Sequence, residues 1–296
     1  MTYFQQLISC TDLHAILDCK DLVVLDASIP PVGKMKAPTH SWPEHCIVKA
    51  RRFDLNQDFS DLDSDMPHTM PCAAHFERAA QALGINQQSQ IVIYDDLGLF
   101  SAARAWYMFR AMGHKNVAVL DGGLPYWLSL NKPVTSAGAD GNTDGLAKGN
   151  AKSNVKGDFV ANVQENYFCD WREVEQQIDE QQEVILDARA NDRFRGIVDE
   201  PRAGVRSGHI PSSKNLPFGE LFDVSNHGLF KSADELTKVF QQLNTANKPM
   251  VMSCGSGVTA CILALAADIS GLEHVRVYDG SWSEWGALPH TQVEKG

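Results

Sequence analysis

The chain has 296 residues, of which 44% are hydrophobic and 21% are charged. This balance excludes a disordered, collagen-like or coiled-coil protein and is typical of a globular chain of about two domains. The formal net charge of −11 weighs against nucleic acid or an anionic membrane as a partner.

The sequence shows neither an export signal nor a metal-binding cysteine pattern. Its first residues, MTYFQQ, lack the basic flank and the apolar run of a signal peptide. The 7 cysteines include no Cys-x-x-Cys pair, and an odd number argues against a disulfide framework. We therefore expect a cytoplasmic protein without a structural metal site, in which one cysteine is a candidate nucleophile.

Three segments of the first half recur in the second half, in the same order and about 160 residues later. Residues 23–28 (VVLDAS) recur as 184–189 (VILDAR), 91–95 (IVIYD) as 250–254 (MVMSC), and 120–127 (LDGGLPYW) as 278–285 (YDGSWSEW). The pattern predicts a tandem duplication, in which Asp95 of the first copy stands where the second copy has Cys254.

The segment between the two copies, residues 136–157, is rich in Gly, Ala, Asn, Asp and Lys. It cannot bury enough apolar surface to offset the entropy of ordering it. We therefore expect an exposed linker at 136–157, between an N-terminal domain at 1–135 and a C-terminal domain at 158–296.

Strand and helix patterns alternate within each copy. In the second copy, residues 184–188, 249–253 and 275–278 are continuous apolar runs, which are typical of strands covered on both faces. Residues 233–243 have helical spacing, and 258–269 are typical of a buried helix. The alternation predicts the α/β class, with a parallel sheet flanked by helices in each domain.

The loop after the predicted strand 249–253 is the strongest candidate for a functional site. Cys254 lies at the carboxyl end of this strand, and Gly255 and Gly257 allow a tight turn before the next helix. The loop N–H groups and the helix N-terminus favour an anion, for which the Cys254 thiolate is the natural candidate. A cysteine phosphatase is excluded because its Cys-x5-Arg motif would need arginine where Ala260 stands.

This loop, residues 278–286 (YDGSWSEWG) and residues 207–211 (SGHIP) resemble the rhodanese superfamily. The similarity is greatest to its two-domain sulfurtransferases. It implies a catalytic C-terminal domain and, because Asp95 replaces the cysteine, a degenerate N-terminal domain. The implied reaction is double displacement through a Cys254 persulfide, cradled by the N–H groups of Gly255, Ser256, Gly257, Val258 and Thr259. The acceptor is cyanide or a thiol, such as that of thioredoxin, and no metal or organic cofactor is required.

The same resemblance predicts the sulfur donor. The thiosulfate branch of the family has basic residues after the cysteine, whereas Gly255 and Ser256 are neutral. The 3-mercaptopyruvate branch binds the carboxylate of its substrate with arginines, and Arg193 (in RFRG) and Arg202 (in EPR) match these positions. Mercaptopyruvate is therefore the expected donor. A thiosulfate enzyme and a persulfide carrier fed by a partner protein are the alternatives.

The resemblance further implies that Ser256 acts with a histidine, for which His68 is the match. His68 would polarise the donor or supply a proton to the departing enolate. Asn56 stands where the family has an aspartate, so a complete serine–histidine–aspartate triad is not expected. Other conspicuous residues are expected to be structural, namely Asp26, Asp187, His209, Cys261, Trp282 and Trp285.

Overall fold

The structure is a computed structural model that describes residues 5–29, 45–136, 155–244 and 246–296. Its contacts divide the chain into two compact units. The first unit comprises Met1–Asp61, Met70–Gln164 and His227–Leu229, and the second comprises Leu62–Thr69, Glu165–Asn226 and Phe230–Gly296. Among the described residues, no helix is both long and apolar enough to cross a bilayer.

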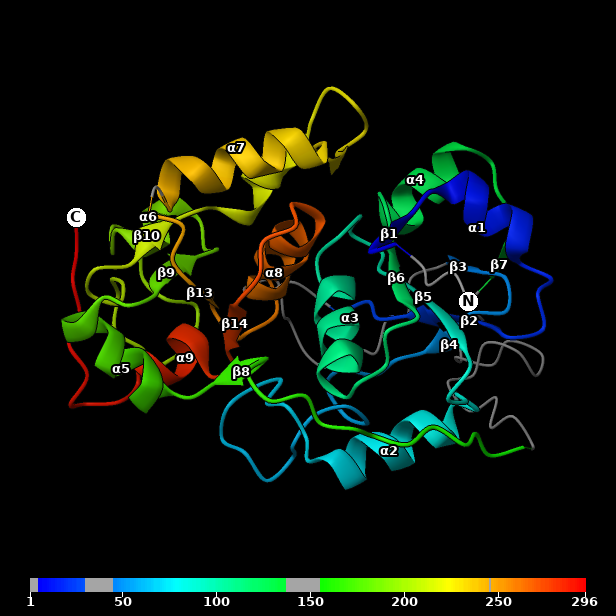
Figure 1. The fold of residues 1–296 in the computed structure, drawn as a ribbon, viewed down its shortest axis with the longest axis horizontal. Helices are drawn as coiled ribbons and strands as arrows, with labels where there is room; N and C mark the ends of the chain where they lie inside the picture. The colour runs from blue at the N-terminus through cyan, green and yellow to red at the C-terminus, as the bar shows by residue number, and fades with distance from the viewer. Residues whose placement is uncertain (1–4, 30–44, 137–154, 245) are drawn as a thin grey trace. The chain divides into compact units, whose positions relative to one another are not determined.

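The first unit is built on a parallel sheet with helices on both faces (Figure 1). The strand order is β1-β6-β5-β2-β4. The strands are β1 (Leu7–Ile8), β2 (Leu22–Asp26), β4 (Arg51–Arg52), β5 (Gln90–Tyr94) and β6 (Val117–Leu120). The helices are α1 (Cys10–Ile16), α2 (Ala73–Ala82), α3 (Ala102–Ala111) and α4 (Gly123–Ser129). A separate antiparallel pair joins β3 (His45–Ile47) to β7 (Val134–Ser136).

The second unit repeats this topology, since its strand order β8-β14-β13-β9-β10 matches that of the first unit strand for strand. The strands are β8 (Phe168–Cys169), β9 (Val184–Asp187), β10 (Lys214–Asn215), β13 (Met250–Ser253) and β14 (Val275–Tyr278). The helices are α5 (Trp171–Glu180), α6 (Asn191–Phe194), η1 (Phe218–Leu221), α7 (Ala233–Leu243), α8 (Ala260–Ile269) and α9 (Ser281–Trp285). Two short strands, β11 (Phe222–Asp223) and β12 (Leu229–Phe230), form a further pair. The duplication and the α/β class are confirmed.

Each sheet is buried on both faces, which explains why its strands are continuous apolar runs. In the second unit, Ile185, Val251 and Tyr278 face a core that includes residues of α5 and α9. The opposite face carries α8, which packs against β13 and β14 and against α7. In α8, all residues from Ala260 to Ala267 are buried, so this helix is apolar all round rather than amphipathic.

The helix ends differ in how well the sequence locates them. The predicted helix 233–243 is observed as α7 with the same bounds, and its N-terminus is fixed by a capping box of Ser232 and Glu235. The predicted helix 258–269 begins only at Ala260. Val258 and Thr259 therefore belong to the loop, and Val258 is apolar because the loop itself is buried.

The last residue of the predicted linker, Gly157, and the residues that follow it pack within the first unit. The Gly157 N–H donates to the Gln81 carbonyl at 2.9 Å, and the fully buried Phe159 ring lies 5.9 Å from that of Phe76. Gly157 approaches the backbone of Ile85 so closely that a Cβ would collide with it. Most of the linker, residues 137–154, lies outside the described residues, and the bounds 1–135 and 158–296 stay a prediction.

Candidate functional site

The Cys254 loop joins β13 to α8 at the carboxyl end of the central strand of the second unit. Cys254 is 1% exposed, and the thiol is free. Its backbone N–H donates to the Ser281 hydroxyl at 3.1 Å, and its carbonyl accepts from the Trp282 N–H at 3.0 Å. The junction of β14 and α9 therefore fixes the backbone on both sides of the cysteine.

Ser281 has a left-handed backbone with a φ of 49°, which is uncommon for a residue other than glycine. Besides accepting from Cys254, its hydroxyl donates to the Tyr278 carbonyl at 2.8 Å. These two hydrogen bonds offset the cost of the backbone conformation. In the first unit, the equivalent Gly123 has a φ of 51°, and a Cβ there would lie 2.6 Å from the Asp95 carbonyl oxygen.

The loop presents several backbone N–H groups that have no hydrogen-bond partner within the part of the chain that the structure describes. They belong to Gly255, Ser256, Val258, Thr259 and Ala260. The turn that aligns them passes through Gly257, whose φ of 72° lies in the left-handed region. Such a set of N–H groups at a helix N-terminus favours an anion, as expected for a thiolate or a persulfide.

The two predicted arginines converge on the residue next to Cys254. A Cβ on Gly255 would lie 3.4 Å from Nη2 of Arg193 and 3.9 Å from Nη1 of Arg202. Gly255 therefore leaves open the space that both guanidinium groups face. Burial lowers the pKa of Arg202, the Arg193 guanidinium lowers it further, and the charges of Cys254 and Glu200 raise it.

A buried chain of ion pairs holds Arg193 in place. Its Nε and Nη2 donate to Glu200 at 3.3 and 2.5 Å. The Glu200 side chain is 3% exposed and also accepts from Arg189 Nη1 at 2.9 Å. Arg189 in turn binds Asp187 at 2.6 Å and lies over the Trp282 ring. This series of ion pairs positions the Arg193 guanidinium at the site and neutralises the buried Arg189 guanidinium.

Ser256 and His68, the pair implied by the family resemblance, lie within hydrogen-bond distance of each other. Nδ1 of His68 lies 3.2 Å from the Ser256 hydroxyl oxygen. The segment Leu62–Thr69 that carries His68 groups with the second unit, although it comes from the first half of the chain. Asn56 belongs to the first unit, where its N–H donates to Asp54 at 2.9 Å.

The residues expected to be structural have structural partners. Asp187 accepts the Arg189 N–H, and Asp26 accepts the Ser28 N–H, both at 2.9 Å. The His209 ring stacks on the ring of Phe194, and its Nδ1 lies 2.9 Å from the carbonyl oxygen of Phe194. Three further residues complete this set: the indole N–H groups of Trp282 and Trp285 donate to the Arg206 and Gln292 carbonyls, and Cys261 is fully buried in α8.

Sequence reasoning missed four residues that support the site, namely Arg189, Glu200, Ser281 and Ser283. Glu200 lies in the EPR segment that identified Arg202, and the two serines lie in the repeated YDGSWSEW segment. The signal for the serines was a difference between the copies, because the first copy has Gly123 and Pro125 at these positions.

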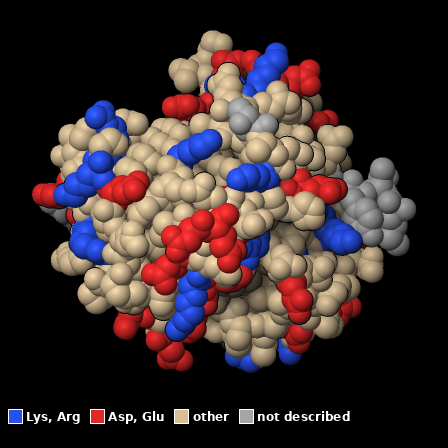
Figure 2. Space-filling view, turned by 60° about the vertical axis from the view of Figure 1, so that its left-hand side comes forward, with Lys and Arg blue, Asp and Glu red and all other residues tan. Residues whose placement is uncertain are grey.

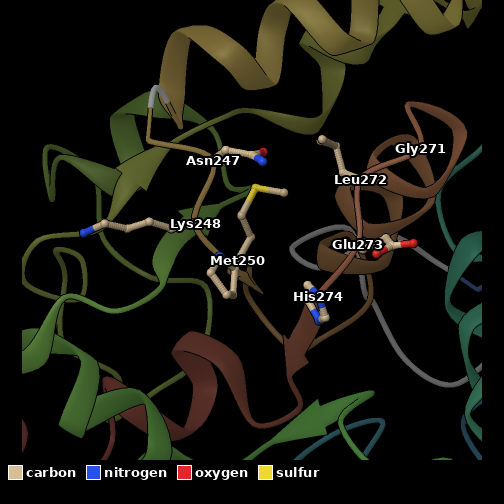
Figure 3. Close-up of a pocket in the computed structure, with 8 residues that line it drawn as sticks. Asn247, Lys248, Met250, Gly271, Leu272, Glu273 and His274 are labelled. Carbon is tan, nitrogen blue, oxygen red and sulfur yellow. The ribbon is translucent and has the colours of Figure 1, made fainter.

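A polar pocket of about 340 Å³ lies at the amino ends of the strands of the second unit's sheet, where β13 and β14 begin (Figure 3). Its lining comes from the turns before these two strands, including Lys248 and His274. It is separate from the Cys254 loop, which lies at the strands' carboxyl ends. Among the described residues, no cluster of His, Cys, Asp and Glu is arranged to hold a metal ion. On the face shown in Figure 2, acidic and basic side chains are interspersed.

The duplicated sheet and the cysteine loop define a class of protein. The model of the rhodanese-like domain matches residues 9–130 and 170–288, and the chain belongs to this family as a two-domain sulfurtransferase. Enzymes of this kind take sulfur from a small-molecule donor and pass it to a thiol acceptor.

Individual relatives in this class are named for the sulfur donor that they use. The 3-mercaptopyruvate sulfurtransferase of Rattus norvegicus is 40% identical, with 93% of this chain and 89% of the relative covered. The thiosulfate sulfurtransferase of the same species is 36% identical over the same shares. The crystal structure of a 3-mercaptopyruvate sulfurtransferase from Escherichia coli matches with a TM-score of 0.78 and 30% identity, covering 94% of this chain and 99% of that one.

Proposed function

We propose that the protein transfers the sulfur of 3-mercaptopyruvate to a thiol through a persulfide on Cys254. One observation carries this proposal: the guanidinium groups of Arg193 and Arg202 converge on Gly255, directly beside the cysteine. A pair of guanidinium groups binds the two oxygens of a carboxylate well, and 3-mercaptopyruvate brings its carboxylate close to its sulfur.

In the first half of the reaction, the Cys254 thiolate attacks the donor sulfur. An S–S bond forms, the C–S bond of mercaptopyruvate breaks, and the electron pair of that bond goes to the methylene carbon. The proton of the donor thiol ends on this carbon, so the products are pyruvate and the Cys254 persulfide anion. The free N–H groups of the loop would stabilise the charge on the outer sulfur.

We assign the proton transfer of this step to Ser256 and His68. The Ser256 hydroxyl lies within hydrogen-bond distance of the His68 ring, which allows the pair to bind the donor carbonyl or to protonate the enolate. Ser256 is 4% exposed, so these steps would take place away from bulk water.

In the second half, a thiolate attacks the outer sulfur of the persulfide and carries it away, which restores the Cys254 thiolate. We propose reduced thioredoxin as a protein acceptor, since it carries two thiols: the first takes the sulfur as a persulfide, and the second attacks the inner sulfur of that persulfide, which forms a disulfide and releases the outer sulfur as hydrosulfide. Small thiols and cyanide would serve in its place in an assay.

The test is a comparison of two donors with one thiol acceptor. We expect kcat/KM to be higher with 3-mercaptopyruvate than with thiosulfate. Arg202→Met should lower the value for mercaptopyruvate about a hundredfold, because a charge-assisted carboxylate contact is lost. Arg195→Met is the matched control, since Arg195 lies in the same segment but is exposed. A higher value with thiosulfate would overturn the proposal in favour of a thiosulfate enzyme, and turnover with neither donor would favour a persulfide carrier.

A further inference from the structure

We infer that Ser283 is a positioning residue for the donor: its hydroxyl ties the Arg202 guanidinium to the carbonyl of Gly255 and so holds it where the donor carboxylate binds. This inference rests on the proposed function, because it assumes a carboxylate donor. It concerns a residue of α9 that lies outside the cysteine loop.

The directions of the hydrogen bonds at Ser283 follow from the chemistry of its partners. Arg202 Nη1 lies 3.1 Å from the Ser283 hydroxyl oxygen and can only donate. The Gly255 carbonyl can only accept, and the Ser283 hydroxyl donates its single proton to it. The hydroxyl thus links the two groups in one fixed order, guanidinium to hydroxyl to loop carbonyl.

The hydroxyl is not needed to hold the loop itself. The backbone N–H of Ser283 also donates to the Gly255 carbonyl at 2.9 Å, and Trp282 holds the Cys254 carbonyl in the same way. Removal of the hydroxyl would therefore leave these backbone hydrogen bonds in place. What it would remove is the hydroxyl that accepts the hydrogen bond of Arg202 Nη1.

The two arginines depend on different partners. Arg193 is fixed by the buried Glu200, whereas the hydrogen bond that holds the Arg202 guanidinium goes to Ser283. Arg202 needs such a partner because burial lowers its pKa, and the like charge of the neighbouring Arg193 lowers it further. Ser283 is 4% exposed, so water does not replace it readily.

The first unit supports this assignment by contrast. The residue equivalent to Ser283 in the repeated segment is Pro125, which has neither a hydroxyl nor an N–H group. The backbone frame is nevertheless retained, because the Leu124 N–H donates to the Asp95 carbonyl at 3.0 Å just as Trp282 does to Cys254. The serine is therefore dispensable for the frame and is present in the copy that carries the cysteine and the arginines.

The test uses Ser283→Ala, with Ser283→Thr as the conservative variant. We expect Ser283→Ala to raise KM for 3-mercaptopyruvate about tenfold, with a smaller change in kcat, because one hydrogen bond to a charged group is lost. KM for thiosulfate, which has no carboxylate, should change less than about twofold. Ser283→Thr keeps the hydroxyl and should restore most of the loss. Ser270→Ala is the control, since its hydroxyl also bonds a carbonyl but at the far end of α8.

The outcomes separate this inference from the proposed function. If the wild-type protein prefers mercaptopyruvate and Ser283→Ala leaves its KM unchanged, the inference is wrong and the function stands. An equal loss with both donors would also contradict it, because the hydroxyl would then support the loop rather than the carboxylate site. If the wild-type protein does not use mercaptopyruvate at all, both proposals fall together.

Discussion

The loops that follow the central strands β5 and β13 occupy equivalent places in the two sheets, but their backbone N–H groups differ in whether they already bind an anionic side chain. In the first unit, the Asp95 carboxylate accepts hydrogen bonds from the N–H groups of Leu97, Phe100, Ser101 and Ala102, at 2.7 to 3.0 Å. In the second unit, the N–H groups of Val258, Thr259 and Ala260 lie at the equivalent junction, where the loop joins α8, and have no hydrogen-bond partner among the described residues. We call the first loop filled, because its own Asp95 side chain binds its N–H groups, and the second loop open, because no side chain of the described residues does so there.

The residue that follows Asp95 or Cys254 also makes the first loop less suited to an anionic ligand than the second. Asp96 follows Asp95, whereas Gly255 follows Cys254 and leaves room beside two arginines. The first loop thus combines a filled N–H cradle with a second acidic residue, which would repel an anionic donor. The comparison teaches that the fold supplies the cradle, while a few side chains decide whether it binds a substrate or stabilises the domain.

The largest effect on stability is expected from a change in the series of ion pairs that supports the second loop, Asp187–Arg189–Glu200–Arg193. Glu200→Gln leaves the guanidinium groups of Arg189 and Arg193 without their shared carboxylate in a buried place. We expect the free energy of unfolding of the second unit to fall by about 3–5 kcal/mol. Urea unfolding followed by amide exchange of β13 would measure it. A loss of less than about 1 kcal/mol would show that the pairs are as weak as exposed ones.

A nearly equal effect is expected at the filled loop. Asp95→Ala would leave four N–H groups without an acceptor, three of them in or beside the first turn of α3. We expect the first unit to lose about 3 kcal/mol of stability, and Asp95→Asn, which keeps one acceptor oxygen, to lose less. Amide exchange of β5 would report the change. Equal stability of Ala and wild type would contradict the idea that the carboxylate supports this loop.

A third change makes the open loop resemble the filled one. Gly255→Asp copies Asp96 of the first loop and places a carboxylate between the two arginines. A Cβ fits there with ordinary contacts, so we expect the fold to survive and kcat/KM for 3-mercaptopyruvate to fall about a hundredfold. Gly255→Asn is the matched neutral control, with an expected loss of about tenfold. If both variants lose the same factor, bulk rather than charge closes the site.

The smallest effect concerns the response of the first unit to acid. His114 is 2% exposed, and its Nε2 lies 2.9 Å from the Ser89 carbonyl oxygen. Burial lowers the pKa of His114, so the unfolded chain binds the proton more tightly. Stability should therefore be retained above the ordinary histidine pKa of about 6.5 and lost as the pH falls below it.

His114→Gln provides the matched variant, since it keeps a donor for Ser89 but does not titrate near neutral pH. We expect its urea midpoint to depend less on pH than that of the wild type between about pH 7 and pH 5. Parallel curves for the two proteins would show that other groups cause the acid sensitivity of the first unit.

The sequence predicts the duplicated fold and the loop well because both leave local patterns. Buried parallel strands are continuous apolar runs, and Cys254 with its two glycines stands at the end of one of them. The apolar pattern predicts a helix start two residues before α8 begins, because Val258 is apolar and buried in the loop as it would be in a helix. Apolar patterns report burial, and they do not separate a buried loop from a buried helix.

The supporting residues could not be found in this way, because their roles depend on contacts between distant segments. Ser283 contacts Arg202 across 81 residues, and Ser281 contacts Cys254 across 27. Glu200 is one acidic residue among 37, and only its burial between two arginines sets it apart. The His68–Ser256 pair was found because a family resemblance, rather than spacing, connected them across 188 residues.

The most direct test of the open loop is the position of the sulfur after one exposure to donor. The protein would be treated briefly with 3-mercaptopyruvate without an acceptor, and its intact mass and the mass of each cysteine peptide would be measured. We expect the gain of one sulfur atom on Cys254 in the wild type and no gain in Cys254→Ser. Sulfur on another of the 7 cysteines, or no gain in the wild type, would contradict the account.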